Sequence, residues 1–144
     1  MTNIHESIIG ILRQPQLACL ATLTPEGKPW VRYVFCAGSE DMTVRFATFV
    51  NSRKVAQIRI NPEVHLTCGV TSPADMKPYL QVQGRADFQV DAAERHGFWK
   101  ESLSSYFQGP DDPNYGIVVI KPYRIELCTP GSPAPEVWGA GTNQ

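Results

Sequence analysis

The residues with the clearest chemical potential lie at positions 46–54, which read Phe-Ala-Thr-Phe-Val-Asn-Ser-Arg-Lys. This pattern predicts a strand that passes through a short polar turn into a helix. Ser52 adds a hydroxyl donor, while Arg53 and Lys54 place two positive charges in the first helical turn, where they oppose the helix dipole. A phosphate would neutralise these charges and accept hydrogen bonds from free backbone N–H groups. The alternative is a solvated basic turn, and the local pattern leaves both open.

Arg32 is a second candidate, because it lies inside the apolar segment 30–37. An unpaired charge in an apolar strand is costly. The side chain must therefore either reach solvent on the outer face of a sheet or meet an anion. The segment alone favours neither.

Other kinds of chemistry find little support. The histidines, His5, His65 and His96, do not have metal-ligand spacing, so no metal site is predicted. The sequence contains no nucleophile motif and no glycine-rich phosphate loop, and no catalytic residue is assigned. The cysteines are widely spread and form no Cys-x-x-Cys pair, which predicts reduced, mostly buried thiols. They are Cys19, Cys36, Cys68 and Cys128.

Strands must position most of these residues. Apolar, β-branched and aromatic runs predict strands over residues 17–23, 30–37, 43–48, 64–70, 79–90, 115–120 and 123–128. Gly84 marks a bulge or a close backbone approach within the fifth run. The first three strands are predicted to form an antiparallel meander.

Three helices interrupt the strands. Asn3 is the expected cap of a helix that ends before Pro15, and a second helix covers residues 52–60. Asp91 and Glu94 resemble a capping box that begins a third helix, running to about residue 107. Its aromatic residues are interpreted as core rather than as cofactor contacts: Trp99, Tyr106 and Phe107.

This order of elements predicts a mainly β protein in which a closed barrel removes exposed strand edges. The length of 144 residues suits one domain. We assign residues 1–128 to the barrel domain and 129–144, rich in Pro, Gly and Ser, to an irregular tail.

Composition limits the partners. A net charge of −1 argues against nucleic-acid binding, which depends on basic surfaces. No stretch approaches the roughly 20 apolar residues that a membrane helix needs. The N-terminal residues do not resemble a signal peptide, so we expect a cytoplasmic protein.

Taken in order, the motifs resemble the FMN-binding core of pyridoxamine 5′-phosphate oxidases and their relatives. The matching segments are 32–35 (RYVF), 47–48 (AT), 52–54 (SRK), 61–62 (NP), 82–86 (VQGRA) and 121–126 (KPYRIE). Segment 111–115 (DDPNY) resembles the short branch called general stress protein 26-like. The ordered set carries the resemblance, since no single motif is specific.

The resemblance implies a six-stranded antiparallel split β-barrel of the FMN-binding type. It also implies a homodimer with FMN at the subunit interface and a small-molecule substrate. Arg32, Arg53 and Lys54 would hold the phosphate, near the Ser52 hydroxyl. The residues that would border the flavin are Tyr33, Val34, Phe35, Ala47 and Thr48.

Three departures separate this chain from the vitamin B6 oxidases. The tail after residue 127 contains no arginine, lysine or histidine, whereas the oxidases bind the substrate phosphate with an Arg-x-His segment. Cys128 replaces a tryptophan, and Tyr79 replaces a glutamine that reaches the flavin. Trp138 is a candidate to cover a flavin instead, in its own subunit or in the partner.

We therefore expect a flavin-dependent oxidoreductase that acts on an unidentified small molecule and is not a pyridoxamine phosphate oxidase. Three alternatives stay open. One is a non-enzymatic FMN-binding stress or sensor protein. Another is a split barrel that binds haem, through His65 or His96, or a deazaflavin. The last is a dimer without a ligand.

Overall fold

The computed structural model describes residues 3–139 and consists mainly of strands. The elements in chain order are α1 (Ile4–Leu12), β1 (Gln16–Leu23), β2 (Pro29–Gly38), β3 (Val44–Phe49), α2 (Arg53–Ile60), β4 (Glu63–Cys68), the 3-10 turn η1 (Pro73–Asp75), β5 (Tyr79–Gln89), α3 (Ala92–Phe98), the 3-10 turn η2 (Glu101–Ser105), β6 (Tyr115–Cys128) and β7 (Glu136–Gly139).

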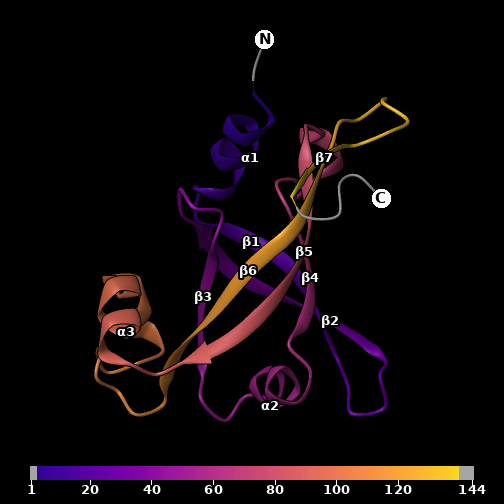
Figure 1. The fold of residues 1–144 in the computed structure, drawn as a ribbon. Helices are drawn as coiled ribbons and strands as arrows, with labels where there is room; N and C mark the ends of the chain where they lie inside the picture. The colour runs from indigo at the N-terminus through magenta and orange to yellow at the C-terminus, as the bar shows by residue number, and fades with distance from the viewer. Residues whose placement is uncertain (1–2, 140–144) are drawn as a thin grey trace.

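The strands form a closed antiparallel barrel (Figure 1). Their order is β3-β2-β1-β4-β5-β6-β7, and an additional pairing of β3 with β6 closes the ring. The first six strands of the chain make the barrel, while β7 extends β6 outside it. The predicted six-stranded antiparallel barrel is confirmed, and closure leaves few unpaired strand edges.

Helices cover the two ends of the barrel, with α1 at one end and α2 at the other (Figure 1). The buried face of α1 consists of Ile8, Ile9 and Leu12. Asn3 caps α1 as predicted, since its Oδ1 accepts a hydrogen bond of 2.8 Å from the backbone N–H of His5. The α2 face that points into the barrel is mixed, because Gln57 is buried beside apolar side chains.

Two predicted strands, 115–120 and 123–128, form one continuous strand, β6. Pro122 lies opposite Gly84, where the register between β5 and β6 shifts. This bulge accommodates a proline that has no N–H to donate. Gly84 is also a close approach, because a Cβ there would lie 2.9 Å from the carbonyl oxygen of Lys121.

The predicted single helix from 91 to about 107 is wrong. Helix α3 ends at Phe98, Trp99 has extended backbone angles, and η2 follows. The predicted capping box does not form, because the Asp91 side chain makes no cap hydrogen bond and Glu94 pairs with Arg45 instead.

The expectation of an irregular tail is wrong for Glu136–Gly139, which form β7. Trp138 pairs with Ile125 of β6. Since β3 pairs only with the first part of β6, the remainder of that edge is open to another strand. The end of the tail, 140–144, lies outside the described residues.

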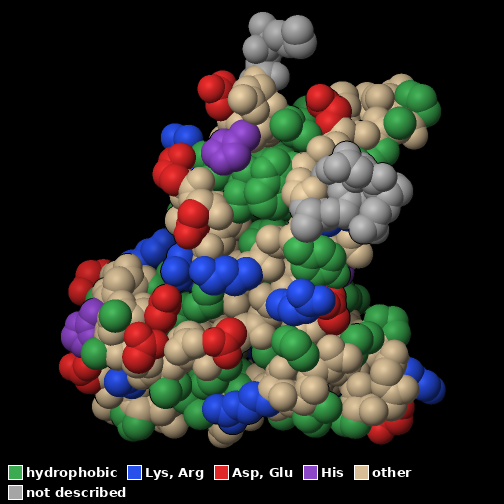
Figure 2. All heavy atoms as spheres, viewed as in Figure 1, with side chains coloured by type: hydrophobic (Ala, Val, Ile, Leu, Met, Phe, Trp, Pro, Cys, Tyr) green, Lys and Arg blue, Asp and Glu red, His purple; other side chains and the backbone are tan. Residues whose placement is uncertain are grey.

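Within residues 3–139, no helix has the length and apolar character to cross a membrane. The same part of the chain holds no group of three or more His, Cys, Asp or Glu side chains suited to a metal ion. On the face shown in Figure 2, acidic and basic side chains are interspersed, without a broad patch of one sign.

Candidate functional site

Three cations from distant segments meet at the α2 end of the barrel. Arg32 lies on β2, and Arg53 and Lys54 begin α2. Burial and the neighbouring charge of Arg53 lower the pKa of Arg32, while burial and the charge of Arg32 lower the pKa of Lys54. None of the salt bridges within residues 3–139 involves these side chains. Among the described residues, the fold therefore gathers positive charge without a salt-bridged carboxylate to balance it.

Arg32 points to the barrel side of its strand, together with Val34 and Cys36, rather than to the outer face. Its Nη1 donates to Thr22 Oγ1 at 2.7 Å and to the carbonyl oxygen of Leu20 at 3.4 Å. Its Nη2 donates to Gln57 Oε1 at 3.2 Å. Neutral oxygens thus hold the guanidinium group and leave its charge uncompensated.

The other polar residues of the predicted site also converge. Lys54 Nζ donates to Thr48 Oγ1 at 3.0 Å, and Thr48 Oγ1 donates to Ser52 Oγ at 3.3 Å. Ser52 is the N-cap residue of α2, but its side chain makes no cap hydrogen bond. Arg53 lies over the Trp30 ring, with its guanidinium carbon 5.4 Å from the ring centroid.

A groove of about 610 Å³ begins beside this cluster. This volume lies within the range of about 300–1,000 Å³ that is typical of small-molecule sites. Six of the predicted site residues line it: Tyr33, Val34, Phe35, Ala47, Thr48 and Lys54. The remaining three, Arg32, Ser52 and Arg53, do not line the groove.

The segment from α3 to η2 forms the opposite wall of the groove, and the sequence interpretation missed its role. Leu103, Tyr106 and Phe107 line the groove, although Phe107 is only 5% exposed. The interpretation of Tyr106 as core is wrong, since 68% of this residue is exposed. Aromatic spacing gave no signal for this wall, because its position depends on how α3 docks against the barrel.

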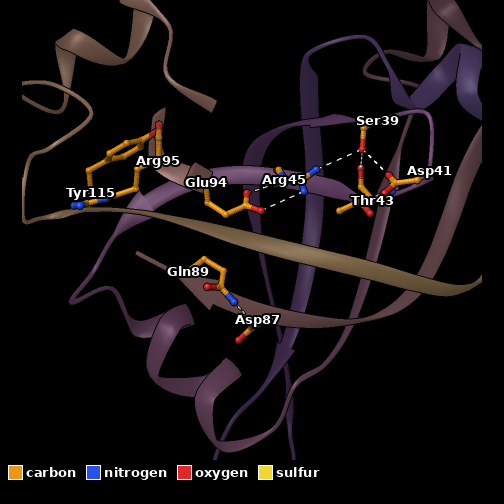
Figure 3. A network of polar contacts seen from close by, with 9 residues as sticks. All are labelled: Ser39, Asp41, Thr43, Arg45, Asp87, Gln89, Glu94, Arg95 and Tyr115. Atoms are coloured by element: carbon orange, nitrogen blue, oxygen red, sulfur yellow. Dashed lines mark hydrogen bonds and ion pairs between the residues drawn. The ribbon is translucent and has the colours of Figure 1, made fainter. Parts of the chain in front are cut away.

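A polar network docks α3 (Figure 3). Arg45 on β3 donates from Nε to Glu94 Oε1 at 2.8 Å and from Nη2 to Oε2 at 3.3 Å. The hydrogen bond to Glu94, together with the negative charge of that carboxylate, raises the pKa of Arg45. Tyr115, which is fully buried, donates its hydroxyl to the Arg95 carbonyl oxygen at 2.9 Å.

Two residues singled out in the sequence lie away from the groove. Tyr79 does not line the groove but lines a neighbouring cavity of about 260 Å³, and Tyr33 contributes to both. Trp138 packs against the core of its own barrel from β7.

The thiols match the expectation of reduced, mostly buried cysteines only in part. All four are free, and Cys36 and Cys68 are buried, whereas Cys19 and Cys128 are partly exposed. Burial raises the pKa of Cys36 and of Cys68 to about 12, so neither is a thiolate near neutral pH.

An apolar face lies outside the barrel on β1 and β2. Val31, Tyr33 and Phe35 alternate along β2 and are 64%, 73% and 56% exposed. Leu17, which is 50% exposed, pairs with Phe35 from β1. We call these four residues the β1–β2 face, and three of them, Leu17, Tyr33 and Phe35, also line the groove.

Comparison with known proteins identifies the family. A family model described as pyridoxamine 5′-phosphate oxidase matches residues 4–129. The chain belongs to this family. It is similar to general stress protein 26 of Bacillus subtilis (strain 168), with 29% identity over 133 residues that cover 92% of this chain and 94% of that one. The structure of general stress protein 26 from Bacillus anthracis (strain Sterne) superposes with a TM-score of 0.81 and 27% identity, covering 96% of this chain and 99% of that one.

The fold is shared more widely. A haem binding protein from Mycobacterium smegmatis has a TM-score of 0.76 at 16% identity, covering 96% of this chain and 59% of that one. An F420 reductase has a TM-score of 0.63 at 26% identity, covering 87% and 98%. Membership of the family therefore leaves the cofactor to be argued from the site.

Proposed function

We propose that this protein binds FMN and acts as a flavin-dependent oxidoreductase on a small molecule. The observation that carries the proposal is the cluster of Arg32, Arg53 and Lys54, which has no balancing carboxylate among the described residues and lies beside an apolar groove. FMN joins a dianionic phosphate to a planar apolar ring. Charge-assisted hydrogen bonds to the phosphate would offset the repulsion and desolvation of the cluster.

The cation cluster, with Ser52, would hold the phosphate. Tyr33, Val34, Phe35, Ala47 and Thr48 would border the ring and exclude water from it. FMN, when bound, supplies the hydride or electron transfer. The described lining of the groove contains no histidine and no carboxylate. Its lysines and tyrosines could carry protons, but no contact singles one of them out, and we assign no catalytic acid or base.

The groove favours FMN over haem. Haem iron requires an axial ligand, commonly histidine. His65 and His96 are exposed, and neither lines the groove. His96 Nε2 instead lies 2.7 Å from Asp111 Oδ1. The adjacent Arg53 and Lys54 favour FMN over a deazaflavin, because they suit a compact terminal monophosphate.

We further propose a homodimer formed through the β1–β2 face. Contiguous exposed apolar surface of this kind marks interaction sites. Because Tyr33 and Phe35 belong both to this face and to the groove, a partner seated here would cover the groove and place FMN at the subunit interface. The free cysteines agree with a cytoplasmic location, where thiols stay reduced.

The substrate is not expected to be a vitamin B6 phosphate, since the tail lacks cationic side chains. The competing function is a non-enzymatic FMN-binding stress or sensor protein, and the absence of an evident acid or base is compatible with it. Oxidation of NADH or NADPH by the FMN-loaded protein distinguishes the two. Steady turnover supports the oxidoreductase, and binding without turnover supports the sensor.

The first experiment is a visible absorption spectrum of the purified protein, followed by identification of the ligand released on denaturation. We expect a flavin spectrum and released FMN. Titration with FMN and with riboflavin, which lacks the phosphate, should show a strong preference for FMN. A colourless protein that does not bind added FMN would overturn the proposed function.

A further inference from the structure

A buried polar pair closes the α2 end of the barrel, where apolar side chains would serve equally well. Thr22 on β1 is 1% exposed, and Gln57 on α2 is 7% exposed. Burying polar side chains costs free energy unless they are hydrogen-bonded. Both residues find that compensation in each other and in Arg32.

Each of the three side chains is hydrogen-bonded to the other two. The Thr22 hydroxyl donates to Gln57 Oε1. Arg32 Nη1 donates to Thr22 Oγ1 at 2.7 Å, and Nη2 donates to Gln57 Oε1 at 3.2 Å. All hydrogen bonds found for this guanidinium within residues 3–139 come from its two terminal nitrogens, so Nε–H stays available.

We propose that Thr22 and Gln57 are positioning residues that hold the Arg32 guanidinium group in place for the cofactor phosphate. This inference rests on the proposed function. An arginine side chain loses considerable conformational freedom when it is immobilised on a ligand. Hydrogen bonds to neutral acceptors immobilise the arginine when the protein folds, so phosphate binding loses less conformational entropy. They also leave the positive charge available to the phosphate, whereas a carboxylate partner would neutralise it.

Helix α2 couples this positioning to the rest of the site. Gln57 lies three residues after Lys54 on the same helix, so one element supplies both the phosphate-binding cations and the acceptor that orients Arg32. Thr22 and Arg32 lie on the paired strands β1 and β2. Docking of α2 onto the barrel thus assembles all four side chains together.

The test measures the dissociation constants of FMN and riboflavin for the full chain freed of flavin. Thr22→Val removes the hydroxyl at nearly constant volume, and Gln57→Leu removes the amide. We expect each change to reduce the preference for FMN over riboflavin by about tenfold, because a hydrogen-bonded charge is no longer held in place. Thr22→Ser should restore most of the preference. Thr43→Val is the matched control, because Thr43 is 2% exposed and directly precedes β3, at the end of that strand remote from α2. This change should leave the preference for FMN unaltered.

A double-mutant cycle gives the sharpest reading. In an Arg32→Ala background, neither Thr22→Val nor Gln57→Leu should reduce the FMN preference further. If Gln57→Leu does not fold, the nearly isosteric Thr22→Val decides the outcome alone. Three outcomes would overturn this inference but leave the phosphate assignment standing. They are an undiminished FMN preference in the variants, equal weakening of both flavins, and a full effect in the Arg32→Ala background. A wild-type protein that binds FMN no better than riboflavin would overturn the phosphate assignment as well.

Discussion

Lys54 connects the two parts of the candidate site, because it belongs to the cation cluster and also lines the groove. Its ammonium group donates to Thr48 Oγ1, and burial lowers its pKa. Lys54 has no salt-bridged carboxylate among the described residues, so a bound phosphate would stabilise its charged form. The proposed site thus depends most directly on single cations.

Lys54→Ala should weaken FMN binding by roughly 1.5–3 kcal/mol, the usual value of a hydrogen bond to a charged group. Riboflavin binding should change much less, since that ligand lacks the phosphate. Fluorescence titration with both flavins measures the difference. Lys121→Ala, at an exposed lysine on β6, is the control and should bind FMN like the wild type. Unchanged FMN affinity in Lys54→Ala would remove this residue from the phosphate site.

Asp41 gives the protein a pH-dependent contribution to stability. Hydrogen bonds from the Ser39 hydroxyl and the Thr43 backbone N–H lower the pKa of Asp41 to about 2. The Asp41 carboxylate therefore takes up a proton more readily in the unfolded chain than in the folded protein. Its contribution to the free energy of unfolding is full above the ordinary pKa of an aspartate and is lost as the pH falls towards about 2. Asp41→Asn should therefore lose less stability than the wild type between about pH 5 and pH 3. Urea unfolding at the two pH values measures this, and equal losses would contradict it.

At the scale of elements, α3 is a short helix that contributes no fully buried side chain. The ion pair between Arg45 and Glu94 compensates, because it ties α3 to β3 through two hydrogen bonds (Figure 3). The side chains are 28% and 25% exposed, so solvent screens the pair only in part. The wall of the groove thus depends on an anchor at its N-terminal end.

Glu94→Ala should reduce the free energy of unfolding by about 1–2 kcal/mol, between the values for exposed and buried charged hydrogen bonds. Urea denaturation followed by circular dichroism measures the loss. Glu101→Ala is the control, because Glu101 is exposed and joins no salt bridge found within residues 3–139. A Glu94 variant as stable as this control would show that the anchor contributes little.

At the scale of the whole molecule, closing the barrel directs alternate strand residues to opposite sides. On β2 this places Arg32 towards the barrel end and Val31, Tyr33 and Phe35 on the outside. One strand therefore serves the proposed phosphate site with one face and the proposed dimer interface with the other. We expect assembly and cofactor binding to be linked for this reason.

Val31→Glu should convert the dimer to a monomer at micromolar concentration, because it places a charge within the β1–β2 face. Val31 does not line the groove, so the change leaves the direct flavin contacts in place. Sedimentation velocity of the FMN-loaded protein measures the oligomeric state. Ile60→Glu is the matched control, since Ile60 is 68% exposed at the end of α2, outside this face. A wild-type protein that sediments as a monomer would contradict the dimer directly.

The sequence by itself determined the features that depend on neighbouring residues. Apolar, β-branched and aromatic runs predict most of the barrel strands, Asn3 is the predicted helix cap, and residues 52–54 predict the basic start of α2. Gly84 is predicted to mark a bulge or a close backbone approach, and both occur there. These predictions succeeded because hydrogen bonding and side-chain periodicity within one segment carry the information.

Only the tertiary structure decided which distant groups meet. Thr22 and Gln57 are 35 positions apart, and each appears as an ordinary polar residue until α2 docks on the barrel. Pro122 suggested the end of a strand, but the bulge opposite β5 lets β6 continue through it. The segment 136–139 became a strand because β6 offers it an open edge. In each case the stabilising contact is made with a segment far along the chain, and local propensity carries no information about such a contact.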